Sequence, residues 1–451
     1  MRISIPDEVE FIIETLEKAG YEAYAVGGCV RDTLLGRIPG DWDITTSALP
    51  IQVKQLFHRT VDTGIAHGTV TVLLKGNGYE LTTFRIDGEY EDARHPKEVI
   101  FTSKLAEDLK RRDFTINAMA YNHRTGIVDL FCGKEDLKEK IIRCVGDAKT
   151  RFEEDALRIM RAVRFSAQLG FSIEEETKTA ASVLVQNLER VSKERIQVEL
   201  VKLLISEHPE KVRELYQMGI SRVILPELDQ VMELEQNNPY HCYTVGEHTI
   251  HMLQEIRADK VLRVTALLHD LGKPECHVKD SKGEDHFNGH AEAGARMAKK
   301  ILRRLKFDND TIRRSENLIR YHAYHLKQDK TVVRKAINQV GKTAFSDLLE
   351  IMEADTKAKS EYTRQERLDD IKMIRMMYEQ ICEEGECVDL AGLAVNGQDL
   401  IQMGMKPGKE LGEVLQKMLE YVLEHPRDNR KEILLEKFAV TGNVSIITEK
   451  Y

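Results

Sequence analysis

The stretch AVGGCVRDTLLGRIPGDWDITT (25–46) decides the fold of the N-terminal part of this chain. It predicts a strand, a turn at Gly27-Gly28 and then a helix that begins near Val30. Glycine lets backbone amides approach a phosphate closely, and the N-terminus of a helix adds partial positive charge. Arg31 lies on the first turn of that helix, where its guanidinium can donate two hydrogen bonds to a phosphate. A Gly-Gly pair alone is more often a plain turn, so the phosphate-binding interpretation depends on the residues that follow.

Two carboxylates follow within the same stretch. Asp41 and Asp43 flank Trp42 on a predicted strand, whose period of two residues places both carboxylates on one face. Adjacent carboxylates repel each other unless a cation lies between them. Mg²⁺ that bridges a triphosphate and an attacking hydroxyl is the usual solution in phosphoryl transfer. The pattern therefore favours a magnesium-dependent transfer site, with Asp41 and Asp43 as its catalytic residues, over an Asp-x-Asp pair in a solvated turn.

The composition is that of a folded protein with a charged surface. The chain has 451 residues, of which 42% are hydrophobic and 31% charged, and its formal net charge of −9 excludes a uniformly basic nucleic-acid coat. Its seven cysteines include no Cys-x-x-Cys pair, which is typical of free thiols in a reducing compartment. No apolar run approaches the ~18 residues of a membrane span, and the N-terminus lacks the core of a signal peptide. We expect a cytoplasmic protein that does not contact membranes.

Strand and helix patterns divide the chain into two kinds of structure. Residues 1–145 contain alternating or β-branched runs that are separated by Gly and Asp. Beyond about residue 150, helical spacing replaces them. We expect an α+β fold, in which a mixed β-sheet with helices precedes an all-helical body. The expected domains are 1–145, 146–236, 237–360 and 361–451.

Three motifs carry a resemblance to a known family. GGCVRD…GDWDITTSA is followed by RRDFTINAMAYN (111–122) and EDALRIMRAVRF (154–165), in the order and spacing of the class II nucleotidyltransferases. This family comprises the CCA-adding enzymes, which finish the 3′ end of tRNA, and the related bacterial poly(A) polymerases. The resemblance is dense over residues 20–205. It implies a nucleotidyltransferase head followed by a helical neck that selects the nucleotide and binds RNA.

The resemblance also implies the reaction and its residues. The head transfers nucleotides from CTP and ATP to the 3′ end of tRNA with release of pyrophosphate, using Mg²⁺ held by Asp41 and Asp43. Related enzymes often place a third carboxylate on a neighbouring strand, where Glu80 is the candidate. Arg112 and Asp113 hold the ribose and phosphate in this scheme, and a carboxylate that accepts from the 2′-hydroxyl excludes dNTPs. The implied nucleotide-binding residues are Gly27, Gly28, Arg31, Arg112, Asp113, Asn117, Asp155, Arg158, Arg161 and Arg164.

Base selection is assigned to the neck. Asp155 and Arg158 are spaced i, i+3 on a predicted helix and are therefore neighbours. The resemblance makes this pair an amino-acid template, because a carboxylate accepts from the exocyclic amine and a guanidinium donates to the ring acceptor that C and A both present. Arg161 and Arg164 continue the spacing toward the triphosphate or the tRNA end. The basic helix over 190–204 is expected to lie along an RNA backbone.

Two related activities share these motifs and stay open as alternatives. One is an A-adding enzyme that follows a separate CC-adding partner, and the other is a poly(A) polymerase. The segment 85–109 resembles the flexible loop of members that add the terminal A, which argues against a CC-only enzyme. The non-basic stretch FAVTGNVSIITEKY (438–451) favours tRNA as the substrate. We therefore expect tRNA, CTP and ATP as partners.

A histidine-rich stretch lies farther along the chain. Imidazoles and carboxylates spread over several helices are what an internal divalent-metal site needs, and LLHDLGKP resembles the HD phosphohydrolase superfamily. The resemblance favours a second divalent metal, held by His248, His269, Asp270, His290 and Asp355. Other histidines compete with His290 for its place, namely His286, His322 and His325. An HD-domain phosphohydrolase whose head only binds RNA is the alternative from another class.

The last part of the chain contains two amphipathic helices joined by GMKPGKELG (404–412). A helix that begins after a glycine turn can hold a backbone phosphate, although a helix–helix connector is the simpler interpretation. The region resembles the tail domain of CCA-adding enzymes, which binds tRNA. The four expected domains are therefore, in chain order, head, neck, HD domain and tail.

Overall fold

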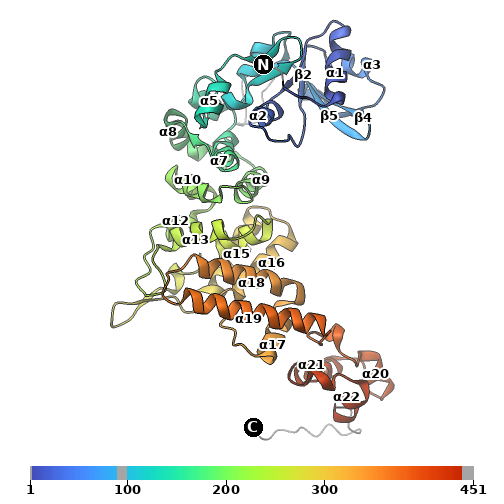
Figure 1. The fold of residues 1–451 in the computed structure, drawn as a ribbon, viewed down its shortest axis with the longest axis vertical. Coiled ribbons are helices and arrows are strands. Elements are labelled where there is room, and N and C mark those ends of the chain that lie inside the picture. The colour runs from blue at the N-terminus through green and yellow to red at the C-terminus, as the bar shows by residue number, and fades with distance from the viewer. Residues whose placement is uncertain (1–2, 89–98, 439–451) are drawn as a thin grey trace. The chain divides into compact units, whose positions relative to one another are not determined.

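The structure, a computed structural model, describes residues 3–88 and 99–438. The centre of the predicted loop and the chain end from residue 439 lie outside the described residues. Figure 1 shows a sheet with helices near the N-terminus and helices through most of the rest, which confirms the expected α+β fold with a helical body. The chain divides into two compact units, one of residues up to Met232 with Ile301–Phe307, and one of Glu233–Lys300 with the residues from Asp308.

The first unit is built on a seven-stranded mixed sheet with the strand order β3-β4-β5-β2-β1-β8-β9. The β2 and β5 strands are parallel, and the other neighbours are antiparallel. Short two-stranded pairs form between β6 and β7 and between β10 and β11 in this unit, and between β12 and β13 in the second unit. The strands are β1 (Ala23–Val26), β2 (Ile44–Thr46), β3 (Thr60–Gly64), β4 (Thr69–Leu74), β5 (Asn77–Thr83), β6 (Arg85–Asp87), β7 (Val99–Phe101), β8 (Met119–Asn122), β9 (Gly126–Asp129), β10 (Ile141–Ile142), β11 (Ser172–Ile173), β12 (Val278–Lys279) and β13 (Asp285–His286).

Helices of the first unit pack on this sheet and then continue into the neck. All residues of β1 are buried, and the first helix, α1, buries its apolar side next to β1. The helices of the neck pack on one another, and the most extensive helix–helix contact of the unit lies between α7 and α9. The helices are α1 (Asp7–Lys18), α2 (Gly28–Leu34), α3 (Pro50–Leu56), α4 (Leu105–Lys110), α5 (Gly133–Glu139), α6 (Ala148–Glu154), α7 (Leu157–Leu169), α8 (Glu175–Leu184), α9 (Lys193–Leu204), α10 (Val212–Gln217), α11 (Ile220–Ile224) and α12 (Pro226–Met232).

The second unit is helical apart from the β12–β13 hairpin. Several of its helices begin at an Asp or Asn whose side chain accepts a hydrogen bond from the first turn, as at Asp259, Asp308 and Asn396. None of the described helices is both long and apolar enough to cross a membrane. The helices are α13 (Val245–Glu255), α14 (Lys260–Leu268), α15 (His290–Arg304), α16 (Asn309–Tyr321), α17 (Lys330–Val340), α18 (Lys342–Lys357), α19 (Arg364–Glu383), α20 (Gly397–Gln402), α21 (Lys409–Glu424) and α22 (Lys431–Phe438).

A close backbone approach brings the end of α14 against the start of α15. A Cβ atom added at Gly272 would lie 2.3 Å from the carbonyl oxygen of His290 and 2.4 Å from the amide nitrogen of Gly294. Both neighbours are backbone atoms, so neither can rotate away as a flexible side chain would. Glycine at 272 therefore allows the turn after His269 and Asp270 to pack against α15.

We predict that Gly272→Ala lowers the thermal stability of the protein by about 1–3 kcal/mol or more, because the added methyl group forces two backbones apart. The matched control is Gly412→Ala in α21, where an added Cβ meets nothing within 4 Å. That change is expected to be neutral or to stabilise by about 0.5–1 kcal/mol, because alanine favours helix more than glycine. Thermal unfolding followed by circular dichroism measures both, and equal stability of the two variants would contradict the close approach.

Candidate functional site

The carboxylates of the head lie at the start of the central strands. β2 begins at Ile44, so Asp41 and Asp43 precede the strand on which they were predicted. The carbonyl oxygen of Asp43 accepts a hydrogen bond from the Val26 amide at 3.0 Å, which keeps this segment extended beside β1. Ile44 pairs with Leu81 in parallel register, so Asp43 and Glu80 occupy equivalent positions on two adjacent segments of the sheet. The sheet therefore brings together the residues that the sequence singled out.

The carboxylates at this edge of the sheet repel one another. Burial of its carboxyl group and the negative charges of Asp41 and Glu80 raise the pKa of Asp43 to about 6, although the Arg112 guanidinium acts in the opposite direction. Asp43 keeps solvent contact, so this burial is partial. Among the described residues, the sets of three ligand groups within 4.8 Å all lie in the second unit. The head is suited to a cation held by one or two carboxylates, with other positions left for substrate oxygens, which is how Mg²⁺ is usually bound.

The Gly27 turn lies beside a cation. Gly27 has φ 84° and ψ −130°, a conformation that residues with a Cβ rarely adopt, and a Cβ atom there would approach Arg112 Nη1 to 3.0 Å. The Nε of Arg112 is buried without a hydrogen-bond partner in the described part of the chain, and its Nη2 is 3.5 Å from Asp108. Arg112 therefore has donor capacity left for an anion at this turn.

Arg31 differs from its expected role. Its side chain is buried, and its guanidinium donates to Asn117 Oδ1 at 2.7 Å and to both carboxylate oxygens of Asp32. α2 begins at Gly28, somewhat earlier than predicted. The structure thus shows Arg31 bound to protein acceptors, and a contact with phosphate would require it to exchange one of them.

Asp113 is the centre of a buried hydrogen-bond network. Its carboxylate accepts from the Phe114 amide at 2.8 Å, from Asn117 Nδ2 at 3.2 Å and from Arg161 Nε at 2.7 Å and Nη2. Although burial alone would raise it, the guanidinium groups of Arg161 and Arg158 and the Asn117 amide hold the pKa of Asp113 below its usual range. Asp113 therefore stays ionised and fixes the orientation of Arg161.

The expected base-selecting pair is not on one helix. α6 ends at Glu154 and α7 begins at Leu157, so Asp155 lies in the break between them and accepts from the Leu157 amide. The other oxygen of Asp155 accepts from Arg195 at 2.7 Å. Arg158 is buried and donates to Glu154 and to two backbone carbonyls. The prediction that Asp155 and Arg158 lie on one helix was therefore wrong.

The neck helix α9 uses part of its charge for packing. Arg164, expected to face the triphosphate or the tRNA, is instead buried beside Phe165 and pairs with Glu199 of α9 at 2.5 Å. Burial lowers the pKa of Arg164 to about 10. Arg195 of the same helix binds Asp155, whereas Arg190 stays exposed. Only some of the basic residues predicted for RNA contact over 190–204 are therefore accessible.

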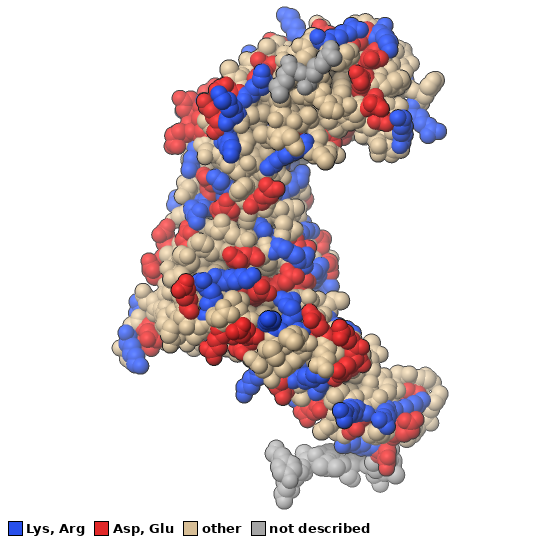
Figure 2. Space-filling view, in the orientation of Figure 1, with Lys and Arg blue, Asp and Glu red and all other residues tan. Residues whose placement is uncertain are grey.

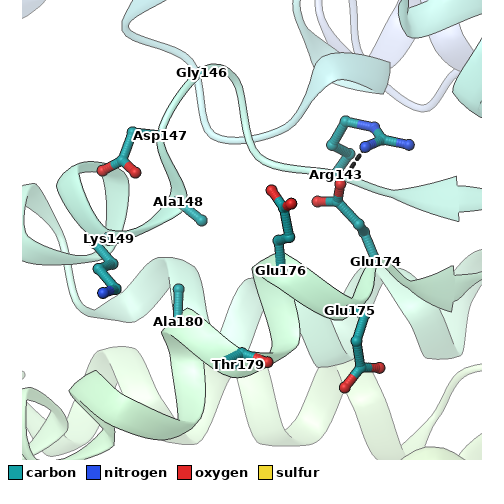
Figure 3. Close-up of a pocket in the computed structure, with 10 residues that line it drawn as sticks. All are labelled: Arg143, Gly146, Asp147, Ala148, Lys149, Glu174, Glu175, Glu176, Thr179 and Ala180. Carbon is teal, nitrogen blue, oxygen red and sulfur yellow. Dashed lines mark hydrogen bonds and ion pairs between the residues drawn. The ribbon is translucent and has the colours of Figure 1, made fainter.

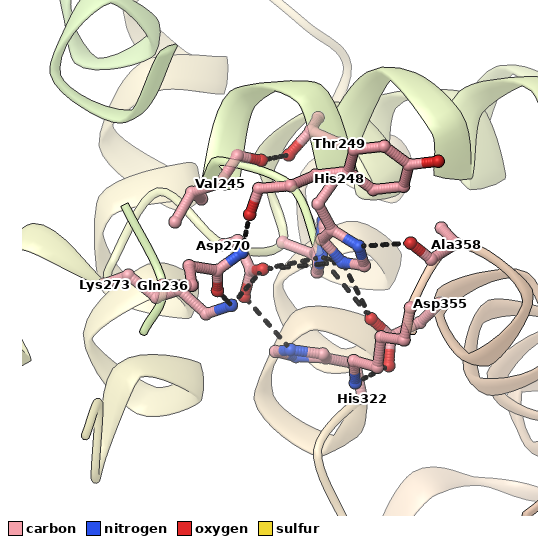
Figure 4. Close-up of polar contacts among 12 residues, drawn as sticks. Gln236, Val245, His248, Thr249, Asp270, Lys273, His322, Asp355 and Ala358 are labelled. Atoms are coloured by element: carbon pink, nitrogen blue, oxygen red, sulfur yellow. Dashed lines mark hydrogen bonds and ion pairs between the residues drawn. The ribbon is translucent and has the colours of Figure 1, made fainter. Parts of the chain in front are cut away.

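The histidine cluster of the second unit joins residues from separate helices (Figure 4). His248 Nε2 lies 3.0 Å from Asp355 Oδ1 and 3.3 Å from His269 Nε2, and His269 Nε2 lies 3.1 Å from Asp270 Oδ2. Two sets of three ligand groups share Asp270, namely His248-His269-Asp270 and Asp270-His290-His322. The structure thus brings the five predicted residues together and adds His322.

Backbone carbonyls orient all four imidazoles of the cluster. The Nδ1 atoms of His248, His269, His290 and His322 lie 3.3, 2.8, 2.7 and 2.6 Å from carbonyl oxygens. A carbonyl can only accept, so each Nδ1 carries the proton and each Nε2 keeps a free lone pair that faces the cluster. A hydrogen bond from Nδ1 to a carbonyl commonly fixes the ring orientation of metal-binding histidines.

Among the competing histidines, the structure selects His290 and His322. His286 pairs with Asp280 on the β12–β13 hairpin, and the exposed His325 lies outside both ligand sets. His322 follows the buried Leu318 and Ile319 by four and three residues, so it shares their face of the helix. That spacing was the sequence signal for His322.

A pocket of about 460 Å³ at the junction of head and neck contains none of the predicted site residues (Figure 3). Its charged lining is mostly acidic, with Asp147, Glu175 and Glu176. Arg143, the lining residue best suited to an anion, pairs with Glu174 and with Asp136. The pocket is therefore poorly suited to a nucleotide phosphate.

Three stretches of the chain match family models. Residues 23–143 match "Poly A polymerase head domain", residues 170–232 match "Probable RNA and SrmB- binding site of polymerase A", and residues 290–438 match "tRNA nucleotidyltransferase domain 2 putative". These matches fall on the head, on the neck, and on the second half of the HD range with the tail.

Curated proteins and solved structures are similar to this chain over 44–95% of its length. A CCA-adding enzyme of Leuconostoc mesenteroides is 38% identical over 442 residues, which are 95% of this chain and 94% of that protein. A CCA-adding enzyme of Lactiplantibacillus plantarum is 58% identical over 198 residues, 44% of this chain and about half, 49%, of that protein. The crystal structure of the Bacillus stearothermophilus CCA-adding enzyme in complex with CTP matches with a TM-score of 0.72 and 30% identity, over 95% of this chain and 96% of that chain.

We predict that removal of one partner from the buried Arg164–Glu199 ion pair between α7 and α9 destabilises the protein. Glu199→Leu leaves the Arg164 charge buried and unpaired, and is expected to cost about 3–5 kcal/mol of stability. The double variant Arg164→Met/Glu199→Leu should recover most of that loss. Asp62→Ala, which breaks the exposed pair with Lys54, serves as the control and should cost about 0–1 kcal/mol. Urea denaturation measures all three, and a Glu199→Leu protein as stable as the control would contradict the prediction.

Proposed function

The chain belongs to the family of CCA-adding enzymes, and from this premise we propose which of its residues carry out the reaction. As a member it is a tRNA nucleotidyltransferase that adds CCA to the 3′ end of tRNA from CTP and ATP, the activity expected from its motifs. The observation that carries the assignment is the relationship over nearly the whole length of both chains. We place the reaction in the cytoplasm, because all seven cysteines are free thiols.

Asp41 and Asp43, with Glu80 beside them, form the catalytic edge of the head. Burial of the carboxyl group, and then repulsion by Asp41 and Glu80, raise the pKa of Asp43. A divalent cation relieves this repulsion, and carboxylate oxygens suit Mg²⁺. Mg²⁺ held there supplies charge neutralisation for the triphosphate and for the attacking 3′-hydroxyl. The two carboxylates thus orient the RNA end toward the α-phosphate, and pyrophosphate leaves on the opposite side.

Arg112 and the Gly27-Gly28 turn receive the phosphates. The guanidinium of Arg112 lies beside the turn with its Nε unused, so it is the cation best placed to approach the triphosphate. Asp113 already accepts four hydrogen bonds, so it reaches the ribose by exchanging one of them. The bond from Asn117 is the longest, at 3.2 Å, and is the one most easily exchanged.

Base choice rests with Asp155 and Arg158. In the structure, Arg195 holds one oxygen of Asp155 and Glu154 holds Arg158, so both groups are preoriented by ion pairs. A base that presents an amine and a ring nitrogen, as C and A do, would be read by exchange of some of these contacts. Figure 2 shows acidic and basic side chains interspersed over the visible face, without a continuous basic band. RNA contact therefore depends on local exposed groups such as Arg190.

We predict that Asp41→Asn or Asp43→Asn lowers the rate of nucleotide addition by at least about 10³-fold, because the charge that holds the cation is lost. The fold should persist, since both side chains are exposed. Asp62→Asn on β3 is the matched exposed control and should retain full activity. Single-turnover incorporation of labelled CMP and AMP measures the effect, and near-wild-type turnover in either variant would overturn the mechanism.

The activity is tested with tRNA transcripts that end at the discriminator base, at CC and at CCA. With Mg²⁺, CTP and ATP, we expect the first to gain CCA, the second to gain A, and the third to remain unchanged at single-nucleotide resolution. Extension of the CC-ended transcript alone would indicate an A-adding enzyme, and long A ladders a poly(A) polymerase. Asp155→Ala should relax the preference for CTP and ATP over UTP and GTP, and an unchanged preference would refute the template role.

A second site binds a divalent metal in the HD range. Four imidazoles whose Nε2 lone pairs converge on Asp270 and Asp355 have the chemistry of a transition-metal site. The residues that would hold the ion are His248, His269, Asp270, His290, His322 and Asp355. Two ligand sets that share Asp270 provide places for one or two ions. The nitrogen-rich donor set distinguishes this site from the all-oxygen site of the head.

We predict that the purified protein retains Mn²⁺ or Ni²⁺ through gel filtration, measured by plasma mass spectrometry. Asp270→Asn and His269→Ala should each weaken retention at least about tenfold, because they remove a ligand. His251→Ala is the control, because His251 belongs to none of the metal-capable sets of the described residues and stacks on Tyr243. Equal metal content in all variants would contradict the site.

A further inference from the structure

A fully buried carboxylate, Asp108 of α4, lies next to Arg112 in the head. Its Oδ1 atom accepts from Arg111 Nε at 3.0 Å and from Arg111 Nη2 at 2.7 Å. Its Oδ2 atom lies 3.1 Å from the Thr45 hydroxyl and 3.5 Å from Arg112 Nη2. One buried carboxylate thus contacts two guanidinium groups and a hydroxyl.

The two guanidinium groups share Asp108 unequally. Arg111 donates two hydrogen bonds to Oδ1 and so neutralises most of the carboxylate charge. Arg112 is too far from Oδ2 for a strong hydrogen bond, and its Nε is buried without a hydrogen-bond partner among the described residues. Asp108 therefore orients Arg112 but leaves its positive charge and its donors for another anion.

The Thr45 contact fixes Asp108 relative to the catalytic edge. Thr45 is fully buried in β2, two residues beyond Asp43, and lies 63 positions from Asp108 in the chain. Their hydrogen bond holds the helix that precedes Arg112 against the strand that follows the catalytic carboxylates. Although burial would raise it, the guanidinium groups of Arg111 and Arg112 hold the pKa of Asp108 below its usual range, so the carboxylate is ionised.

The two terminal nitrogens of Arg112 have different neighbours. Nη2 is the one near Asp108, whereas a Cβ atom added at Gly27 would lie 3.0 Å from Nη1. The guanidinium therefore extends from the buried carboxylate to the backbone turn that is proposed to receive the phosphates. A long side chain loses rotamer freedom when it is fixed, and a carboxylate that restrains Arg112 in advance removes that loss from nucleotide binding.

We propose that Asp108 is a positioning residue for nucleotide addition, which holds Arg112 toward the triphosphate of the incoming nucleotide. The inference rests on the proposed role of Arg112 and names the group that orients it. Asp108 acts through Arg112 and contacts neither the substrate nor the metal. If Asp108 only neutralised charge, its loss would make the site more positive and tighten the binding of an anion. Loss of positioning weakens that binding, so the two roles predict opposite changes.

The test measures kcat/KM for CTP with the full-length protein and a tRNA transcript that ends at the discriminator base, together with inhibition by pyrophosphate. Asp108→Asn should lower kcat/KM about tenfold or more, mainly through a higher KM, and should weaken inhibition by pyrophosphate by a similar factor. In the Arg112→Gln background, the same change should alter kcat/KM by less than about twofold, because the group through which Asp108 acts is gone. Glu386→Gln, which breaks a buried pair with Arg334 in the second unit, is the control and should leave both measurements unchanged.

A second variant covers the case in which Asp108→Asn does not fold, because that change removes the counter-charge of Arg111. Thr45→Val removes one hydrogen bond from the Asp108 carboxylate and keeps its charge. It should lower kcat/KM about two- to tenfold, again only in protein that has Arg112. Circular dichroism at the assay temperature verifies the fold of each variant.

The outcomes separate this inference from the proposed role of Arg112. Arg112→Gln should itself lower kcat/KM at least about tenfold, and wild-type activity in that variant would overturn both. An impaired Arg112→Gln protein in which Asp108→Asn, or Thr45→Val in its place, causes the same further loss as in the wild-type background overturns the positioning role alone. Pyrophosphate that inhibits Asp108→Asn as strongly as wild type, or more strongly, also overturns it.

Discussion

The buried ion pair between Asp113 and Arg161 is the interaction on which the first unit depends. Removing a carboxylate and a guanidinium from water costs several kcal/mol per ion unless each is fully satisfied. Here Asp113 accepts four hydrogen bonds, and the Asn117 that supplies one of them also accepts from Arg31. This chain of contacts connects α2, the 3₁₀ turn Thr115–Asn117 and α7. The turn that precedes α2 is therefore fixed relative to the helix that carries Arg158.

The second unit also buries a polar cluster, in which imidazoles take the place of the guanidinium. Neutral histidines can be buried at lower cost than charged groups, provided that each N–H finds an acceptor. Backbone carbonyls supply those acceptors and leave every Nε2 facing Asp270 and Asp355, while Lys273 and Lys359 balance the carboxylates. The close approach at Gly272 brings the α14 turn to α15. A preformed cluster results, in contrast to the open carboxylate edge of the head.

The accessibility of the head site agrees with the size of its ligands. The head keeps Asp41, Asp43 and Glu80 accessible, as a site must that admits both a nucleoside triphosphate and an RNA end. Most arginines near it are already paired with carboxylates or amides, and Arg112 retains donor capacity beside the Gly27 turn. Arg112 is therefore the cation of the head that is best placed to receive an anion.

The sequence by itself determined the succession of a sheet with helices and a helical body, and it singled out Asp41, Asp43, His269 and Asp270, because turn chemistry and periodicity are local properties. It also gave the family, because several short motifs fall in a fixed order. It did not determine that Asp155 lies in a helix break, that Arg164 pairs with Glu199, or that His322 rather than His325 joins the cluster. Those facts were decided by tertiary structure alone, because they depend on which elements pack together. The Arg31–Asn117 bond joins residues 86 positions apart, and no local pattern encodes such a distance.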